Sequence, residues 1–312
     1  MLLLYRKIAV IMAAVAAILA LSVPFNSKLV QTNENNAIVK FLADPKELDI
    51  VSLGTSHSKS AYDFEDLGLS HLSLASSSQN FHYDYELLKE YSRYMKKDAA
   101  VIISISHIGF YTNYLSETLT KFYDILDLRD YPNFDLLSYY RYKCLPATIK
   151  GYFKSLASRK LNAIGNIFID KSASSYAAPN PVQCRNRFDS KSSHNSEQKL
   201  NDGLPERNLA ILNEIISFCR AKGFKPIMIM EPLYYEYVDY ITLELEYKWV
   251  GQYLDRLEDK EILFLNYSRD ERFIYRKELF SDSDHLNAEG RKEFSGFVFD
   301  VLADNGYLQE GL

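Results

Sequence analysis

A short apolar run in the first third of the chain constrains the fold most strongly. Residues 99–105 read Ala-Ala-Val-Ile-Ile-Ser-Ile, which is apolar on both faces of a strand and rich in β-branched side chains. Strands of this kind are buried on both sides, as in the centre of a parallel sheet that helices cover. The run therefore predicts an α/β fold with a central parallel sheet.

Strands and helices alternate along the rest of the chain. We expect further strands at 48–53, 71–75, 226–230 and 261–266, and helices at 83–97, 209–223, 240–257 and 288–302. This alternation with short links predicts a three-layer α/β/α architecture. A long insertion, residues 107–203, follows the third strand. Its last part, residues 171–203, is rich in Ser, Asn and Lys and predicts a surface loop.

Composition and charge narrow the class of protein. The 312 residues are 47% hydrophobic and 25% charged, which is typical of a globular protein with a sizeable core. The net charge of −5 argues against a nucleic-acid partner. Three cysteines are too few for a disulfide scaffold and fit no zinc spacing. A Cys144–Cys184 disulfide and free buried thiols both fit the sequence, and we favour free thiols.

The first residues predict a membrane segment. Residues 8–23 contain no charged side chain, follow Arg6 and Lys7, and end before Pro24. Together with the leucines at the N-terminus, this run nearly spans a bilayer core of about 30 Å at about 1.5 Å per residue. Basic residues on the short N-terminal side keep that side cytoplasmic and place the body of the chain outside.

A cleaved signal peptide is the alternative, because Ala20 and Ser22 stand at the small-residue positions of a cleavage site. We favour the anchor, and both interpretations place the rest of the chain beyond the membrane. The chain then divides into an anchor or signal segment (1–27), a polar spacer (28–47) and one domain (48–312).

A candidate acid–base pair lies near the C-terminus. In residues 281–287, Ser-Asp-Ser-Asp-His-Leu-Asn, Asp282 precedes His285 by three positions, which is the spacing of one tight turn. An Asp on imidazole Nδ1 fixes the tautomer and leaves Nε2 free to accept a proton from a nucleophile. Ser56, in the Gly-containing turn after the strand at 48–53, supplies that nucleophile.

Both motifs belong to the same edge of the predicted sheet. Ligands of a doubly wound sheet bind beyond the C-terminal ends of its strands. Ser56 follows the first strand, and His285 lies on the loop between the last strand and the last helix. Ser56 as a helix cap and His285 as a solvated loop histidine are the structural alternatives. His57 and His107 belong to the same edge, and we interpret them as structural or substrate-lining.

These blocks resemble the SGNH/GDSL hydrolase superfamily. Gly54-Thr55-Ser56 is similar to its first block, and the nine residues from Asp282 to Gly290 are similar to its last, the Asp-x-x-His block. The resemblance covers about residues 49–106 and 204–302. It implies an SGNH/flavodoxin-like fold, the catalytic residues Ser56, Asp282 and His285, and neither a cofactor nor a metal.

A narrower resemblance concerns the cell envelope. Ser77-Ser78-Gln79-Asn80 followed by Tyr83-Asp84-Tyr85 is similar to membrane-anchored bacterial SGNH-like proteins of envelope polysaccharide systems. These include the D-alanyl-transfer proteins of teichoic acids and the alginate O-acetylation proteins. The resemblance implies an extracytoplasmic serine esterase or acyltransferase for acetyl or D-alanyl groups. Its partners would be an envelope glycan or glycolipid, the membrane, and a membrane-bound O-acyltransferase.

The chain departs from the superfamily at two blocks. The Gly-x-Asn-Asp block would fall at residues 104–109, where no Asn stands, and Ser77 or Ser78 occupies the place of the second-block Gly. These blocks normally donate hydrogen bonds to the oxyanion. The donors here would be the Ser56 amide, the Ser78 region, and the Gln79 or Asn80 side chain.

Two other classes of function remain open. One is a catalytically silent glycan-binding module, and the other is a structural subunit of a membrane acyltransferase complex. The basic stretch 141–171 fits a solvated helix face and an anionic lipid or glycan site equally well. The presence of Ser56, Asp282 and His285 together favours the enzyme, because a silent module has no need of all three.

Overall fold

The computed structural model describes residues 5–14, 17, 36–111, 122–123, 125–131, 134–137, 139, 180–194 and 203–308. The chain divides into two compact units. The first holds Met1–Val39 and Glu117–Ser174, and the second holds Lys40–Ser116 and Ser175–Leu312. The second unit carries the sheet and all the candidate catalytic residues, so the function is argued from that unit.

Among the described residues, five parallel strands form one sheet in the order β2-β1-β3-β4-β5. The strands are β1 (Leu48–Leu53), β2 (His71–Ser73), β3 (Met95–Ser104), β4 (Lys225–Met230) and β5 (Leu263–Asn266). The strand predicted from the apolar run lies at the centre, where Ile102 pairs with Ser52 of β1 and Ile227 of β4. The prediction of a central parallel sheet is confirmed.

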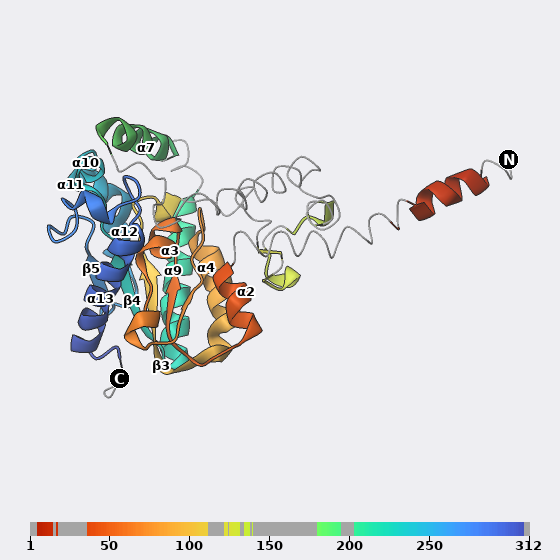
Figure 1. Ribbon diagram of the computed structural model, residues 1–312, viewed down its shortest axis with the longest axis horizontal. Helices are drawn as coiled ribbons and strands as arrows, with labels where there is room; N and C mark the ends of the chain where they lie inside the picture. Colours follow the sequence, from red (N-terminus) through yellow and green to blue (C-terminus); the bar gives the residue numbers. More distant parts are fainter. Residues whose placement is uncertain are drawn as a thin grey trace, which may run out of the picture. The chain divides into compact units, whose positions relative to one another are not determined.

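Helices cover both faces of the sheet (Figure 1). The longer ones are α4 (Phe81–Tyr91), α9 (Leu204–Lys222) and α13 (Ala288–Asp304), with the short α3 (Ser56–Ala61) at the end of β1. Helix α4 packs against α9, and α3 packs against α13. The predicted three-layer α/β/α architecture is therefore confirmed.

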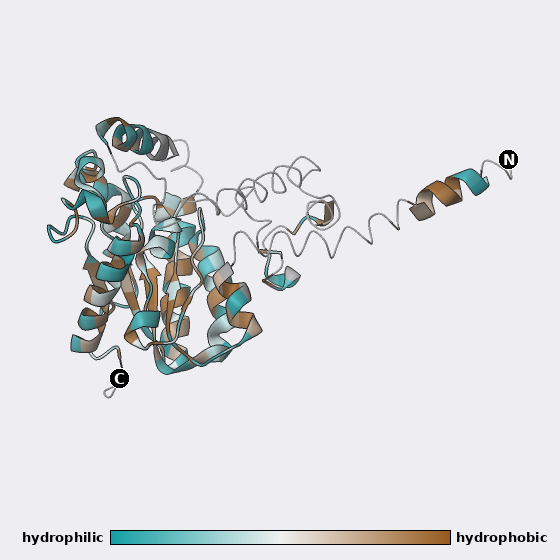
Figure 2. Ribbon diagram, in the orientation of Figure 1, coloured by the Kyte–Doolittle hydropathy of each residue, from teal (hydrophilic) through white to brown (hydrophobic). Residues whose placement is uncertain are grey.

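Burial of the strands explains why this sheet forms. Ile50, Val101, Ile103 and Ile227 are completely buried, and Figure 2 shows apolar strands between helices with hydrophilic outer faces. Each such side chain contributes about 1.5–3 kcal/mol by leaving water.

Short helical elements connect these strands and helices. They include η1 (Glu65–Leu67), η2 (Ser92–Tyr94), η3 (Gly109–Tyr111), η5 (Leu128–Asp130), α10 (Tyr235–Val238) and η7 (Lys277–Leu279).

Two predicted helices differ from the observed ones. The helix expected at 83–97 ends at Tyr91, and Met95–Lys97 belong to β3 because Met95 pairs with Leu48 of β1. The single helix expected at 240–257 is three pieces in the structure. They are α11 (Leu243–Glu246), a π-helical segment η6 (Tyr247–Gly251) and α12 (Gln252–Leu254).

The insertion and the spacer also contain helices that we did not predict. Helix α7 (Pro181–His194) forms inside residues 171–203, so the interpretation of that segment as a loop is wrong for these residues. Helix α2 (Asn36–Ala43) forms inside the predicted spacer. The basic stretch 141–171 lies outside the described residues. Cys184 and Cys219 are free and buried, and Cys144 lies outside the described residues.

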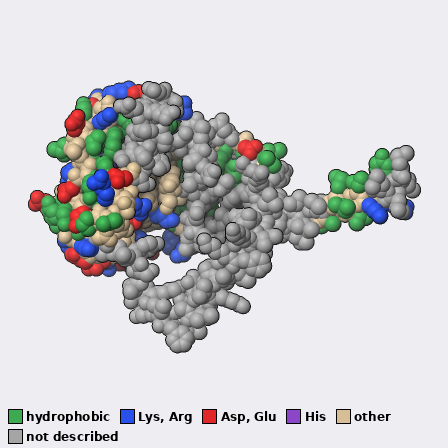
Figure 3. Space-filling view, turned by 90° about the horizontal axis from the view of Figure 1, so that it is seen from above, with side chains coloured by type: hydrophobic (Ala, Val, Ile, Leu, Met, Phe, Trp, Pro, Cys, Tyr) green, Lys and Arg blue, Asp and Glu red, His purple; other side chains and the backbone are tan. Residues whose placement is uncertain are grey.

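The described part of the N-terminal segment is helical. Residues 5–14 form a helix whose exposed surface is largely hydrophobic, with basic side chains near its start (Figure 3). No helix in the described ranges is both long and apolar enough to cross a membrane. The rest of the predicted segment 1–27, residues 1–4, 15–16 and 18–27, lies outside the described residues.

Candidate active site

A tight turn after β1 positions the nucleophile candidate. Gly54 has φ +125°, and a Cβ atom there would lie 2.5 Å from the Ser104 Cβ, so no other residue fits this turn without displacement. The N-cap of α3 is Thr55, whose hydroxyl accepts from the His57 amide. Because Thr55 caps the helix, the Ser56 hydroxyl is not needed as a cap.

Ser56, His285 and Asp282 form one hydrogen-bonded series. The Ser56 Oγ lies 2.8 Å from the His285 Nε2, and the His285 Nδ1 lies 2.7 Å from the Asp282 Oδ1. A hydrogen bond from the Ser281 amide to the His285 carbonyl (2.9 Å) closes the turn that brings Asp282 back to the imidazole. The order nucleophile, base and orienting carboxylate is that of a serine triad.

The environment keeps Asp282 ionised. Burial, the largest single influence, raises the pKa of this carboxyl, but the hydrogen bond and charge of His285 oppose it and the net pKa lies below the usual value. A carboxylate at this position would stabilise an imidazolium formed by proton transfer to His285.

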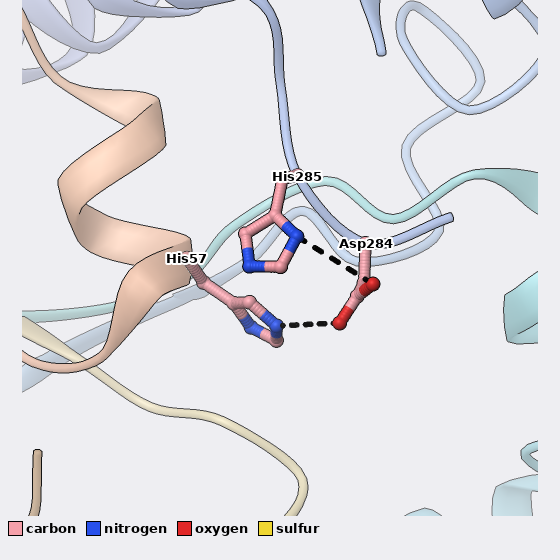
Figure 4. Close-up of side chains that lie close together, drawn as sticks. All are labelled: His57, Asp284 and His285. Atoms are coloured by element: carbon pink, nitrogen blue, oxygen red, sulfur yellow. Dashed lines mark hydrogen bonds and ion pairs between the residues drawn. The ribbon is translucent and has the colours of Figure 1, made fainter. Parts of the chain in front are cut away.

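A second His–Asp pair lies beside the first (Figure 4). The His57 Nε2 is 3.2 Å from the Asp284 Oδ2, and the His57 and His285 rings meet edge to face with centroids 5.2 Å apart. The other Asp284 oxygen is 3.6 Å from the His285 Nδ1, which is beyond hydrogen-bond distance. Asp284 therefore orients His57, and Asp282 orients His285.

Helix α7 contributes a charge to the site. The Arg187 Nη2 donates to the Asp282 Oδ2 at 2.8 Å, and the Arg187 Nε lies 3.5 Å from the Asp284 Oδ1. This guanidinium thus contacts both carboxylates of the two His–Asp pairs. Sequence reasoning missed Arg187, because an arginine in a polar stretch nearly a hundred positions upstream of Asp282 carries no recognisable spacing.

Asp84 stabilises the nucleophile turn by a buried hydrogen bond to its backbone. Its Oδ1 accepts from the Gly54 amide (2.8 Å) and from the Gln79 Nε2 (2.6 Å), and the side chain is almost fully buried. The Gln79 Nε2 also donates to the Leu74 carbonyl (3.0 Å). Both N–H groups of the Gln79 amide are therefore committed, which gives Gln79 a structural role in place of the expected oxyanion contact.

The other expected oxyanion donors lie near the same turn. The Asn80 side chain caps α4 by accepting from the Tyr83 amide (3.2 Å). Ser78 has a left-handed backbone with φ 57°. Donation to an oxyanion by the Ser56 amide, the Ser78 region and the Asn80 side chain stays a prediction.

A buried carboxyl group lies under the site. Glu231 follows β4 and accepts from the Ser104 hydroxyl (2.8 Å) and the Tyr62 hydroxyl (3.0 Å). Burial raises the pKa of Glu231 to about 7. A charged residue directly after an apolar strand was the sequence signal that could have drawn attention to it.

One cluster of described residues has metal-ligand geometry. Ligand atoms of His57, Asp284 and His285 lie within 4.8 Å of one another. However, Ser56 and Asp282 already engage the two ring nitrogens of His285. A metal ion at this cluster would have to displace a triad contact.

Comparison with protein families and with curated proteins gave no match for this chain. A function therefore has to be assigned from the geometry of the site and the chemistry of its residues.

Proposed function

We propose that this chain is an extracytoplasmic serine acyl-esterase or acyltransferase of the SGNH/GDSL type. Its substrates would be O-acyl groups, acetyl or D-alanyl, on a cell-envelope glycan. The observation that carries the proposal is the hydrogen-bonded series Ser56–His285–Asp282, with distances of 2.8 and 2.7 Å. A nucleophile, a base and an orienting group in reach of one another are the requirements for covalent acyl transfer.

The reaction follows from these contacts. The Ser56 Oγ attacks the acyl carbonyl carbon and its proton passes to the His285 Nε2. The bond from that carbon to the leaving alkoxide breaks, and the alkoxide takes the proton from His285. A water or sugar hydroxyl then attacks the acyl-enzyme and gives its proton to His285. The Ser56 Oγ leaves and recovers that proton.

The place of action in this proposal comes from the N-terminal segment. An apolar run behind Arg6 and Lys7 would anchor the chain with its body outside, next to lipid-linked or wall glycans. A membrane-bound O-acyltransferase that supplies the acyl donor would be a partner in this setting. Secretion after signal cleavage is the alternative.

A catalytically silent glycan-binding or accessory subunit is the second candidate. The observations that favour it concern the oxyanion site, since no Asn stands at residues 104–109 and the Gln79 amide is committed elsewhere. Loss of one oxyanion donor costs about 10²–10³ in rate. A protein that retains the triad contacts but stabilises no oxyanion would bind glycan without turnover.

Active-site labelling separates the two candidates. The full chain in detergent is treated with an alkyl phosphonate serine probe, and the labelled peptide is identified by mass spectrometry. We expect the label on Ser56, and we expect Ser56→Ala to lose p-nitrophenyl acetate hydrolysis by about 10³-fold or more. Ser60→Ala is the matched control, because that hydroxyl is in the same helix and bonds the His57 carbonyl. Absence of labelling and of hydrolysis in a folded protein would favour the silent subunit.

Transfer and hydrolysis are separated by a second measurement. The protein is incubated with an activated acyl donor in the presence and absence of envelope glycan, and acylated sugar is compared with free acid. We expect the sugar ester to accumulate when glycan is present. Free acid as the sole product at saturating glycan would identify an esterase.

A further inference from the structure

A small, largely enclosed pocket borders the nucleophile turn. Its walls come from α3, the loop after β3, α7, α10 and η6, and they include His57, Ser106, His107, Phe188, Tyr237 and Trp249. The space in which the centre of a water-sized group can lie is about 10 Å³, which is room for about one small group of that size.

The pocket lies next to the triad. His57 directly follows Ser56, and its ring centroid is 5.2 Å from that of His285. On the neighbouring strand β3, Ser104 packs so closely on Gly54 of the nucleophile turn that a Cβ atom there would lie 2.5 Å from the Ser104 Cβ. Ser106 follows two residues later. A group seated in this pocket would therefore be adjacent to an acyl carbon bound to Ser56.

Ser106 supplies a hydroxyl that has no hydrogen-bond partner among the described residues. The residue is 4% exposed, and its Oγ makes no hydrogen bond within the described ranges. A buried hydroxyl left unpaired costs about 1–3 kcal/mol, so nearly all such groups in proteins find a partner. The neighbouring His107 differs, because its Nε2 lies 3.5 Å from the Glu246 carboxylate. A ligand oxygen in the pocket would satisfy Ser106.

Aromatic side chains form the opposite wall. The Phe188 ring of α7 lies with its centroid 6.3 Å from that of Trp249 and 5.5 Å from that of Tyr240. The preceding residue, Arg187, binds Asp282. One turn of α7 therefore fixes the position of this wall relative to the triad.

We propose that this pocket is the acyl subsite and that it selects an acetyl group. The methyl group lies against Phe188 and Trp249, and the Ser106 hydroxyl donates a hydrogen bond to the acyl oxygen. Ser106 keeps its proton while Ser56 gains and loses the acyl group. This assignment rests on the proposed function and chooses acetyl over D-alanyl. The D-alanyl group is larger and carries an ammonium, and the described lining contains no carboxylate.

Acyl selectivity tests the size of the pocket. Hydrolysis of p-nitrophenyl acetate, butyrate and D-alanyl esters is measured with the full chain. We expect kcat/KM for acetate to exceed the butyrate value by about tenfold or more, since one methylene in a tight pocket already changes rates by about 10–200-fold. Phe188→Ala should bring butyrate to within about threefold of acetate. Val182→Ala, an exposed position of the same helix, should leave the acetate preference unchanged.

Ser106→Ala tests the hydrogen bond. We expect kcat to fall by about 10²–10³ with little change in KM, because the contact strengthens as charge develops on the acyl oxygen. The control is Ser58→Ala. The Ser58 hydroxyl is also buried and also lacks a partner in the part of the chain that the structure describes, but Ser58 does not line the pocket. Both variants should fold normally, since deletion of an unsatisfied group carries little penalty.

The outcomes separate this assignment from the proposed function. If Ser56 is labelled and acetate is hydrolysed, but Ser106→Ala is fully active, the pocket holds only a structural water and the acyl subsite lies elsewhere. The same conclusion follows if butyrate or the D-alanyl ester is preferred by the wild-type protein. If no ester is hydrolysed and Ser56 is not labelled, the proposed function fails and this assignment fails with it.

Discussion

Asp282 and Asp284 offer the sharpest test of the site, because they differ by two positions and both lie within 4 Å of His285. The Asp282 Oδ1 is 2.7 Å from the His285 Nδ1, and the nearest Asp284 oxygen is 3.6 Å away. The Asp284 carboxylate instead lies 3.2 Å from the His57 Nε2 and accepts from the Ser283 hydroxyl at 3.0 Å. Replacement of each by Asn therefore has different consequences.

The expected magnitudes follow from these distances. In Asp282→Asn the amide can present N–H to the imidazole, which favours the wrong tautomer and costs about 10⁴ in kcat, or about 5.4 kcal/mol of transition-state stabilisation. In Asp284→Asn no direct bond to His285 is lost, and we expect less than about a tenfold change in kcat. Asp284 is nearly completely buried. Its loss of charge should therefore lower the free energy of unfolding by about 1–3 kcal/mol.

The assay is p-nitrophenyl acetate hydrolysis by each variant, together with urea unfolding to show that both fold. Ser56→Ala provides the background rate. A larger loss of kcat in Asp284→Asn than in Asp282→Asn, with both variants folded, would refute the assignment of Asp282 as the orienting carboxylate.

Three further predictions follow from contacts around the triad. Arg187→Gln should lower kcat/KM on the order of tenfold, because Asp282 loses a hydrogen bond that fixes its position. The free energy of unfolding should change by about 1 kcal/mol or less, because the guanidinium is partly exposed. A variant as active as the parent would contradict this prediction. Glu231, with its pKa raised from 4.5 to about 7, binds a proton more tightly in the folded state. The contribution of Glu231 to the free energy of unfolding, about 3 kcal/mol, is therefore fully present below about pH 4.5 and is lost as pH rises through about 7. In urea unfolding, the stability of Glu231→Gln should depend less on pH than that of the parent. Gly54→Ala should lower the melting temperature and abolish hydrolysis, since its Cβ would lie 2.5 Å from that of Ser104; an active, stable variant would show that the turn can shift.

Helix α7, which belongs to the insertion, contributes two residues to the candidate site. Two consecutive residues, Arg187 and Phe188, contact the orienting carboxylate and line the small pocket, respectively. The helix lies between two stretches outside the described residues. A segment whose composition predicted only a surface loop thus supplies part of the site, and the experiments on both residues test whether the insertion belongs to the catalytic unit.

Local patterns in the sequence were sufficient for the sheet and for the triad. The run at 99–105 is apolar on both faces, so it is buried on both faces only at the centre of a sheet that helices cover. The strand that contains most of it, β3, lies at the centre of the sheet. Asp282 and His285 are three positions apart, so one turn decides their contact. Ser56 follows β1, and parallel strands place their C-terminal ends at one edge, so its meeting with His285 followed from topology.

Tertiary structure decided the features that depend on residues distant in sequence. Met95–Lys97 are strand rather than helix because pairing with β1 outweighs helical periodicity. The role of Asp284 could not be predicted, since its oxygen meets a histidine 227 positions away. Arg187 and Ser106 lie at the site only because α7 and the loop after β3 pack beside the nucleophile turn. Burial and charge at a site are properties of the assembled chain, whereas strand periodicity and a tight turn are properties of neighbouring residues.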